Sequence, residues 1–439
     1  MRLPWRRADA GHVLTVAELQ SRADRTSLRN FVVYLGPALM VSLAYMDPGN
    51  YGTDMASGSI FKYDLIWAIW LASGMAMILQ YLSGKLGIAS GHSLPEMVRK
   101  SLVRRYYVIP YWLAAEAAAA ATDLAEYLGT VIALYLLFGI PLIYSAIFGA
   151  LDVLLILTMM DRRFRVVERF FMIFVSILVI GFLYQLAVIK PSLNQIAYHS
   201  VVPGPFTSVA ILLVVGNIGA TVMPHALFVH SWLTKHKMGL TGKKIPGATD
   251  NNSEFTMEMK VRTRIFHKWE TIVFLSIAGV VNVGILLVAI PLTNFSSIPD
   301  AVKDMRVQFG SIFAIVFALT LLSSGLTSST LGTIAGQIIM EGLIGKRLNV
   351  WLRRIITRFV NVFPTTLAIL AGIDPLRLLV YSQVVLSLLI PLPMIPLVYY
   401  TSKKKFMGPF VNRRITIIAA LISAGLILAF NTYFLFTLI

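Results

Sequence analysis

The sequence has no cysteine and few charged side chains for its 439 residues. Without a thiol, a disulfide framework, a thiolate metal site and a cysteine nucleophile are excluded, so a soft metal ligand can only be Met and an imidazole ligand must be one of seven His. Charged residues make up 13% of the chain, apolar residues make up 57%, and the mean hydropathy is +0.75. Soluble domains do not have this composition, which predicts an integral membrane protein without a separate soluble domain.

Apolar stretches of about the 20 residues needed to cross a bilayer recur from Phe31 to the C-terminus. We expect eleven membrane-spanning helices, at 31–58, 63–89, 109–136, 140–160, 166–189, 206–234, 268–293, 309–344, 350–372, 375–400 and 413–437. Alternate connections are rich in Lys and Arg, and the intervening ones carry almost no positive charge. By the positive-inside rule, the N-terminus is expected in the cytoplasm and the C-terminus outside, in a plasma (inner) membrane protein. The net charge of +17 therefore reflects topology and not a nucleic-acid partner.

Two hydrophilic segments precede or interrupt these spans. Residues 1–30 contain six Arg and no apolar core, which is typical of a cytoplasmic tail and not of a cleaved signal peptide. The connection 235–267 is rich in Lys, Gly, Asn and Thr and lacks apolar periodicity, which predicts a mobile cytoplasmic loop.

Helix-breaking residues lie in the middle of the first and sixth predicted spans. Pro48 and Gly49 interrupt the first, and Pro224 interrupts the sixth. Since five spans separate the two breaks, the second half of the chain enters the membrane from the opposite side. Broken helices at matching positions of inverted halves predict a substrate site near the bilayer midplane.

The residues at the breaks offer ligands for a metal ion. A proline within a helix repels the carbonyl four residues earlier, so Pro224 frees the carbonyl of Ala220, and Pro48 acts in the same way at the first break. At membrane depth such an oxygen needs a partner, and a cation can be one. Asp47 adds a carboxylate and Asn50 an amide oxygen. In a soluble chain Asp-Pro-Gly-Asn would form a surface turn, but its apolar flanks favour a site within the membrane.

Met223 directly precedes the proline of the second break. Met most often fills space in a hydrophobic core, and the chain has 18 of them. Beside a broken helix and a freed carbonyl, however, its thioether completes a mixed oxygen and sulfur site. Such a site favours borderline transition-metal ions over the hard ions Mg²⁺ and Ca²⁺.

Two histidines follow the second break. His225 and His230 lie five residues apart on one half-helix and point to different faces, which excludes a shared metal ion. For His225 two interpretations stay open: a buried His bonded to a carbonyl freed by the break, or a group that handles protons near neutral pH. A metalloenzyme would need a His-Glu-x-x-His motif or a third ligand, so we expect no enzymatic activity.

Three acids share one face of the third predicted span: Glu116, Asp123 and Glu126. Acidic side chains at membrane depth are costly and indicate an interior proton or salt-bridge pathway. Three arginines at the start of the ninth span are the available partners: Arg353, Arg354 and Arg358. Whether these arginines pair with the acids or are anchors at the cytoplasmic surface stays open.

Two motifs carry a family resemblance. Asp47-Pro-Gly-Asn50-Tyr-Gly-Thr-Asp54 and Ala220-Thr-Val-Met223-Pro-His225 resemble the signature motifs of the Nramp family of divalent-metal transporters. Further segments in family order, such as Ser382-Gln383-Val-Val-Leu-Ser387, extend the resemblance over nearly the whole chain. It implies an all-α, LeuT-like fold with inverted five-helix repeats at 31–189 and 206–400 and one extra helix at 413–437.

By position, the resemblance also implies roles for single residues. The implied metal ligands are Asp47, Asn50, the carbonyl of Ala220, Met223 and, in one conformation, Gln383. The implied proton route consists of Asp47, His225, Glu116, Asp123 and Glu126, with Arg353 and Arg354 as partners. The implied function is import of Mn²⁺ or Fe²⁺, with Cd²⁺ and Co²⁺ as further substrates, coupled to proton co-transport by alternating access.

The sequence departs from the family pattern at two positions. Ala226 stands where an Asn often follows the histidine, and Leu326 stands where a Gln often precedes the Thr-Ser-Ser run, so two polar groups near the implied pathway are missing. Two alternatives stay open: an amino-acid or amine transporter on the same fold, and an uncoupled metal uniporter or channel. The expected partners are the metal ion, the proton and the lipid bilayer, without a prosthetic group. The oligomeric state stays open, and a monomer is compatible with the sequence.

Overall fold

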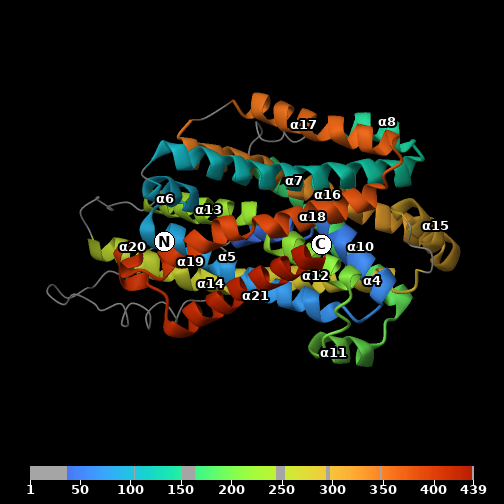
Figure 1. Ribbon diagram of the computed structural model, residues 1–439, viewed down its shortest axis with the longest axis horizontal. Coiled ribbons are helices and arrows are strands. Elements are labelled where there is room, and N and C mark those ends of the chain that lie inside the picture. The colour runs from blue at the N-terminus through green and yellow to red at the C-terminus, as the bar shows by residue number, and fades with distance from the viewer. Residues whose placement is uncertain are drawn as a thin grey trace, which may run out of the picture.

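The computed structural model describes residues 37–102, 104–150, 164–243, 253–292, 297–346 and 349–437. Within these ranges the regular elements are all helices, and most of them run along the long axis of the molecule (Figure 1). The helices of the first half are α3 (Pro37–Ala44), α4 (Pro48–Phe61), α5 (Ile66–Ser90), α6 (Leu94–Ser101), α7 (Arg105–Phe138), α8 (Leu142–Gly149), α10 (Phe164–Ile189) and α11 (Leu193–Val201). Those of the second half are α12 (Ser208–Val222), α13 (Pro224–Lys243), α14 (Ser253–Ala289), α15 (Ile298–Phe309), α16 (Ser311–Ile344), α17 (Val350–Leu370), α18 (Pro375–Leu389), α19 (Pro391–Thr401), α20 (Lys404–Met407) and α21 (Arg414–Thr437).

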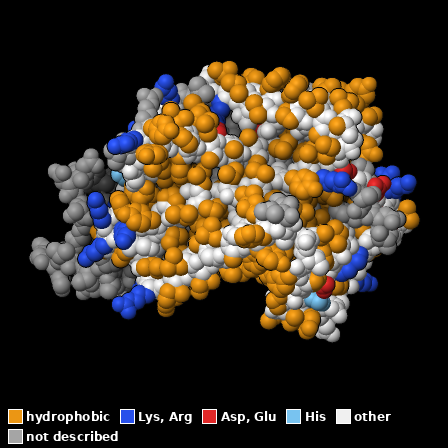
Figure 2. Space-filling view, in the orientation of Figure 1, with side chains coloured by type: hydrophobic (Ala, Val, Ile, Leu, Met, Phe, Trp, Pro, Cys, Tyr) orange, Lys and Arg blue, Asp and Glu red, His pale blue; other side chains and the backbone are white. Residues whose placement is uncertain are grey.

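The outer surface fits a bilayer. Figure 2 shows a broad apolar face, with Lys and Arg gathered toward the two ends of the molecule. Among the described residues, seven helices are long and apolar enough to cross a membrane, or eight if the sharply bent pair formed by α10 and α11 is one span. Of the other predicted spans, the first is divided into α3 and α4, the fourth is described only as far as α8, and the ninth, α17, carries three Arg. The count of eleven spans therefore stays a prediction.

The ends of α7 show how the local sequence forms these helices. Its middle is a run of alanines around Glu116, and Ala has the most favourable helix propensity of all residues. The helix ends at Gly139, which adopts a φ of +67° and donates its N–H to the carbonyl of Tyr135 at 2.9 Å. Only glycine adopts this conformation without steric cost, so Gly139 sets where the helix ends.

The connection 235–267, predicted as a loop, is largely helical, so that prediction is wrong for most of its length. Helix α13 continues to Lys243, and α14 already begins at Ser253. The first turns of α14 are stabilised by an ion pair between Glu258 and Arg262 at 3.0 Å, and Val261 packs into the core. Ion pairs four residues apart support helices, and this signal was overlooked because the segment is polar overall. Residues 244–252 lie outside the described part of the chain.

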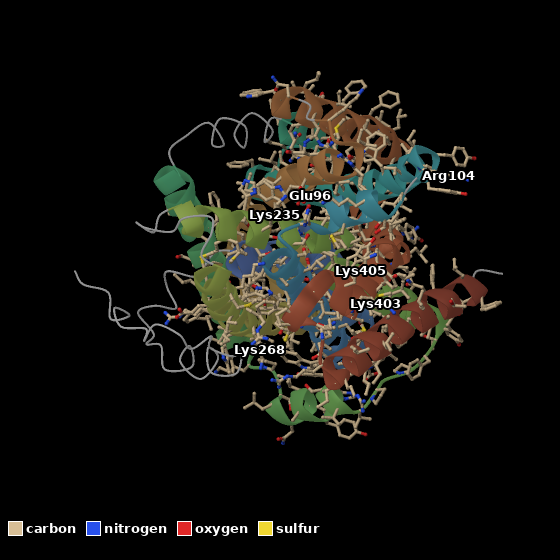
Figure 3. All side chains as sticks on the ribbon, turned by 90° about the vertical axis from the view of Figure 1, so that its left-hand side faces the viewer. Glu96, Arg104, Lys235, Lys268, Lys403 and Lys405 are labelled. Atoms are coloured by element: carbon tan, nitrogen blue, oxygen red, sulfur yellow. The ribbon has the colours of Figure 1, made fainter. Side chains whose placement is uncertain are left out.

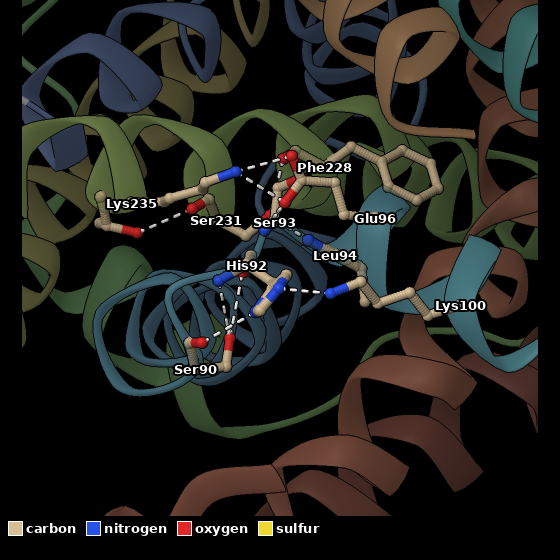
Figure 4. A network of polar contacts seen from close by, with 10 residues as sticks. Ser90, His92, Ser93, Leu94, Glu96, Lys100, Phe228, Ser231 and Lys235 are labelled. Atoms are coloured by element: carbon tan, nitrogen blue, oxygen red, sulfur yellow. Dashed lines mark hydrogen bonds and ion pairs between the residues drawn. The ribbon is translucent and has the colours of Figure 1, made fainter. Parts of the chain in front are cut away.

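Helix α6 fastens α13 to the neighbouring α5, as Figure 4 shows. The Lys235 ammonium contacts the Glu96 carboxylate at 2.6 Å, and the N–H of Leu94 donates to the hydroxyl of Ser231 at 2.9 Å. Burial would raise the pKa of Glu96, but the hydrogen bonds from Lys235 and from the N–H of Ser93 outweigh it and hold the pKa below its usual value. The half-helix that follows the second break is thus held near its middle, two to three turns after Pro224.

Candidate metal site at two helix breaks

Both predicted helix breaks are present in the structure. Helix α3 ends at Ala44 and α4 begins at Pro48, whose missing N–H is not needed at the first position of a helix. Asp47 caps α4, because its Oδ1 accepts the N–H of Asn50 at 2.9 Å. In the second break a single residue, Met223, separates α12 from α13.

Met223 has a strained backbone. Its φ is +49° and its ψ is 98°, which is uncommon for a residue with a side chain. Its side chain is completely buried, and its N–H reaches the carbonyl of Gly219 at 3.3 Å. Strained residues persist only where the surrounding structure holds them, and they cluster at functional sites. This geometry turns the chain at the position where the sequence predicts a sulfur ligand.

Asn50 joins the two breaks. Its Nδ2 donates to Asp47 Oδ1 at 2.8 Å, to the carbonyl of Tyr45 at 3.1 Å and to the carbonyl of Ala220 at 3.3 Å. Asp47, Asn50 and Ala220 are therefore in direct contact although 170 residues separate Asn50 from Ala220. The three acceptors form a cluster of oxygen atoms around one donor group, which is the environment a cation prefers.

The orientation of the Asn50 amide differs from the one expected for a ligand. Its Oδ1 points away from the oxygen cluster and accepts hydrogen bonds from the Thr221 hydroxyl and from Asn282 Nδ2, each at 3.2 Å. A half-turn of the planar amide exchanges its oxygen and nitrogen, so the same residue can present its oxygen to the cluster. Sequence reasoning missed Thr221 and Asn282, although a lone Asn inside the apolar α14 is a detectable signal.

Two buried oxygens at the breaks are left for another partner. Among the described atoms, Asp47 Oδ2 and Gln383 Oε1 are buried and have no hydrogen-bond partner. Buried polar oxygens without partners are rare in native proteins and need an explanation. A bound cation would satisfy both kinds of oxygen, so the residues present fit a metal ion.

Gln383 lies against both breaks. A Cβ atom placed on Gly49 would come within 2.4 Å of Gln383 Nε2, and one placed on Gly219 would come within 1.8 Å of the Gln383 carbonyl oxygen. Glycine at these two positions therefore lets α18 approach the breaks closely. The structure thus places Gln383 beside both breaks, and its role as a metal ligand stays a prediction.

Charged side chains from α7 and α17 form a second polar cluster, which we call the acid–arginine cluster. Glu116 contacts Arg353 at 2.5 Å, and Asp123 contacts Arg354. Arg358 lies 3.6 Å from Asp123, whose second oxygen accepts a hydrogen bond from Asn361 at 2.7 Å. The arginines are thus paired with the acids inside the molecule, and of the two open interpretations the structure supports pairing.

Glu126, the third acid predicted on this face of α7, is arranged differently. Glu126 is buried, and its Oε2 has no hydrogen-bond partner among the described atoms. A Cβ atom placed on Gly332 of α16 would come within 2.7 Å of that oxygen, so the carboxyl faces this helix. Glu126 therefore differs from the two acids that are paired with arginine.

The two histidines behave as separate units, as predicted from their spacing. His225 Nδ1 lies 2.9 Å from the hydroxyl of Thr122 on α7, and not on a carbonyl freed by the break as one interpretation held. His230 Nδ1 lies 2.9 Å from Gln80 Oε1 on α5. Within the described ranges, no three His, Asp or Glu side chains are grouped as ligands of one metal ion. The predicted set differs in kind, since it has one carboxylate and takes its other donors from amides, a carbonyl and a thioether.

A sequence model described as "Natural resistance-associated macrophage protein-like", Nramp, matches residues 38–437. The chain belongs to this family. Among its relatives are two proteins named divalent metal cation transporter MntH. The one from Granulibacter bethesdensis is 36% identical over 426 residues, which cover 93% of this chain and 92% of the relative. The one from Deinococcus radiodurans is 36% identical over 431 residues, with coverage of 96% and 94%.

Solved structures agree with the Nramp assignment. The manganese transporter of Eremococcus coleocola superposes with a TM-score of 0.78 at 30% identity, over 92% of this chain and 86% of that one. Mhp1, a nucleobase-cation-symport-1 family transporter, superposes with a TM-score of 0.56 at 17% identity, over 92% of this chain and 93% of that one, and this likeness concerns the fold alone. The predicted all-α, LeuT-like fold is confirmed, while the repeat boundaries stay predictions.

Proposed function

We propose that this Nramp protein imports divalent transition-metal ions, Mn²⁺ and Fe²⁺ above all and also Cd²⁺ and Co²⁺, by alternating access coupled to proton co-transport. The observation that carries the proposal is the contact of Asn50 with both Asp47 and the carbonyl of Ala220, which unites two buried helix breaks. Helix ends that meet inside a membrane protein form a small polar site in which an ion can replace its water by protein oxygens. The relatives named as divalent metal and manganese transporters support the choice of ion.

In this proposal the metal ion is held by a mixed set of ligands: Asp47, Asn50, the carbonyl of Ala220, Met223 and, in one conformation, Gln383. Asp47 supplies the negative charge, and the half-turn of the Asn50 amide directs its oxygen toward the ion. The sulfur of Met223 disfavours Mg²⁺ and Ca²⁺, which bind only hard oxygen donors well. Pro48, Gly49 and Pro224 keep the two helices open at this level.

The proposed proton route runs from Asp47 and His225 to the acids of α7. His225 Nδ1 lies 2.9 Å from the hydroxyl of Thr122 on α7, the helix that also carries the three acids, which supports this direction of the route. Asp123 and Glu116 are paired with Arg354 and Arg353, whereas Glu126 forms no ion pair with the described residues, which favours Glu126 as the group that accepts and releases the proton. Intramembrane acids arranged in this way are typical of proton relays.

We further propose that the chain lies in the plasma (inner) membrane with its N-terminus in the cytoplasm and its C-terminus outside. The distribution of Lys and Arg between alternate connections supports this orientation. Import then follows the membrane potential, which adds about 2.3 kcal/mol per charge for every 100 mV. The proposed protein works without a prosthetic group, and a monomer suffices for the site because all ligands come from one chain.

The test is transport by the purified chain in liposomes that contain a metal-sensitive dye and a pH-sensitive dye. We expect Mn²⁺ that enters the liposomes to quench the metal-sensitive dye. When the outside is acidic and the inside is negative, the metal flow should be inward, without an outward flow. Metal entry should be accompanied by internal acidification, and both signals should increase with an inward proton gradient. Metal entry without acidification would contradict proton coupling, and no entry of Mn²⁺ or Fe²⁺ would contradict the proposed function.

A further inference from the structure

A basic pocket lies between α5, α14 and the residues that lead into α21. None of its lining residues within the described ranges belongs to the two helix breaks. Its cavity has a volume of about 920 Å³. Five cationic side chains line it: Lys85, Arg264, Lys268, Arg413 and Arg414. None of the described lining residues is acidic. A cavity with this excess of positive charge is suited to an anionic ligand.

Two cationic groups of the basic pocket, those of Lys85 and Lys268, are positioned by neighbouring side chains. Lys85 is only 4% exposed, and its Nζ donates to Asn412 Oδ1 at 2.7 Å. The ammonium also lies 5.8 Å from the ring centre of Tyr81, and no carboxylate of the described residues pairs with it, which is costly for a buried charge unless an anion approaches. The Lys268 ammonium lies 5.4 Å from the ring centre of Trp269, which orients it at the wall of the cavity.

The same cavity also has an apolar wall. Met77, Ile78 and Ile272 line it, and beyond it α14 and α21 expose further apolar side chains, such as Ile277 and Ile418. Exposed apolar flanks of this kind contact acyl chains in a membrane protein. A ligand that spans both regions needs an anionic head and an apolar tail.

The position of the basic pocket agrees with a lipid leaflet. Figure 3 looks at the end of the molecule where Lys268, Lys403 and Lys405 are found, and the distribution of basic connections predicts that this end is cytoplasmic. The cytoplasmic leaflet carries anionic lipids, and basic pockets between membrane helices on that side bind their headgroups. A free phosphate ion shares the anionic chemistry but leaves the apolar wall without a partner.

We propose that the basic pocket binds an anionic glycerophospholipid, with its phosphodiester against the five cationic side chains and an acyl chain along α14 and α21. This lipid ties α21 to α5 and α14. The site is separate from metal transport and does not depend on which ion is carried. Each basic side chain near an anionic lipid contributes about a fivefold preference for it over a neutral lipid.

The test uses Trp269 as a probe in the full-length chain, inserted into lipid nanodiscs of phosphatidylcholine. A low, equal mole fraction of phosphatidylglycerol or phosphatidylcholine with brominated acyl chains is added, and quenching of tryptophan fluorescence is recorded. Trp269→Phe is measured in parallel, because its difference from the natural chain isolates this one of seven Trp. We expect brominated phosphatidylglycerol to quench Trp269 at least about fivefold more than brominated phosphatidylcholine.

Two triple variants with the same change of charge sharpen this test. Lys268→Gln/Arg413→Gln/Arg414→Gln removes three of the five cations from the basic pocket, all three exposed, and should strongly lower the preference for phosphatidylglycerol. Lys403→Gln/Lys404→Gln/Lys405→Gln removes three exposed cations from the same end, outside the lining, and should retain it. If the first triple variant unfolds, Arg414→Gln alone should lower the preference by about fivefold.

Three results would overturn the proposal. One is equal quenching by the two brominated lipids in the natural chain. Another is an equal loss of preference in both triple variants, which would reflect general attraction of the lipid to a basic surface. The third is removal of the preference by millimolar inorganic phosphate at constant ionic strength, which would assign the basic pocket to the free ion.

Discussion

The two helix breaks create a similar opening by different means. The first break leaves three residues between α3 and α4, and Asp47 satisfies the start of α4 from an ordinary extended conformation with a φ of −85°. The second break leaves only Met223, which is held at a φ of +49°. The first break thus provides charge through a side chain, and the second provides a carbonyl and a sulfur through a strained turn. We infer that retention of a cation and choice of the cation depend on different breaks.

The largest effect is expected for Asp47→Asn. Asn also caps helices well, so the variant keeps the start of α4 and loses the charge at the metal site. Leaving the ion without its carboxylate should cost about 3 kcal/mol or more, which reduces Mn²⁺ transport at least a hundredfold. Transport into liposomes measures this change.

Asp374→Asn is the matched control for that variant. Asp374 also caps a helix, since it accepts the N–H of Leu376 at the start of α18 at 2.7 Å, but it is not a predicted ligand. Its variant should transport normally. If both variants fail alike, or if Asp47→Asn still transports Mn²⁺, the proposed role of the first break is wrong.

Two glycine substitutions, one at each break, compare how tightly α18 packs there, measured as a loss of folding stability. In Gly219→Ala the new methyl group would overlap the backbone carbonyl of Gln383, which cannot move alone, so we expect a loss of about 3 kcal/mol of folding stability. In Gly49→Ala the overlap is with the end of the Gln383 side chain, which can turn away, so the loss should be smaller. Thermal unfolding in detergent measures both. Equal losses would show that α18 does not fit the breaks as described.

Met223→Leu tests the choice of ion. Leu has nearly the volume of Met but no sulfur, so the fold should lose less than about 1.5 kcal/mol. Competition assays should show that the preference for Cd²⁺ or Mn²⁺ over Ca²⁺ falls about tenfold, which corresponds to 1.4 kcal/mol. Met394→Leu, at another fully buried Met, should leave the preference unchanged. An unaltered preference in Met223→Leu would remove the sulfur from the proposed site.

The smallest effect concerns the anchor of the half-helix after the second break. In the folded protein the pKa of Glu96 is held below its usual value by the ion pair with Lys235. The pair therefore stabilises the fold fully at pH values above the pKa of an unfolded Glu, about 4.3. This stabilisation is lost as the pH falls through the lower pKa of the folded state. Glu96→Gln should therefore lower stability by up to about 1 kcal/mol at pH 7 and have no effect in strong acid. Thermal unfolding at both pH values measures it. Glu258→Gln, whose partner lies on the same helix, should change stability less, and a pH-independent effect of Glu96→Gln would contradict the electrostatic origin.

The sequence allowed both breaks to be predicted, because proline has a fixed effect on a helix wherever it stands. It also offered pairing of the acids with Arg353 and Arg354 as one of two open interpretations, and the structure decides for pairing because charges at membrane depth are stabilised by opposite charges. The partners of the Asn50 amide could not be predicted, since its contact with Asn282 depends on how α14 packs against α4. The helical start of α14 was missed for a related reason: its stability comes from packing of a few residues, such as Val261, and not from an apolar period.

The acid–arginine cluster has a consequence for how the chain enters the membrane. Each arginine of α17 opposes insertion by up to about 3 kcal/mol when it is alone at membrane depth. Its compensating acids lie on α7, and 237 residues separate Arg353 from Glu116. α7 is synthesised long before α17 and carries its acids without partners during that time. We therefore expect α7 to stay in a hydrated or protein-lined environment, or to carry protonated acids, until α17 emerges, so that the last third of the chain completes the insertion of the first.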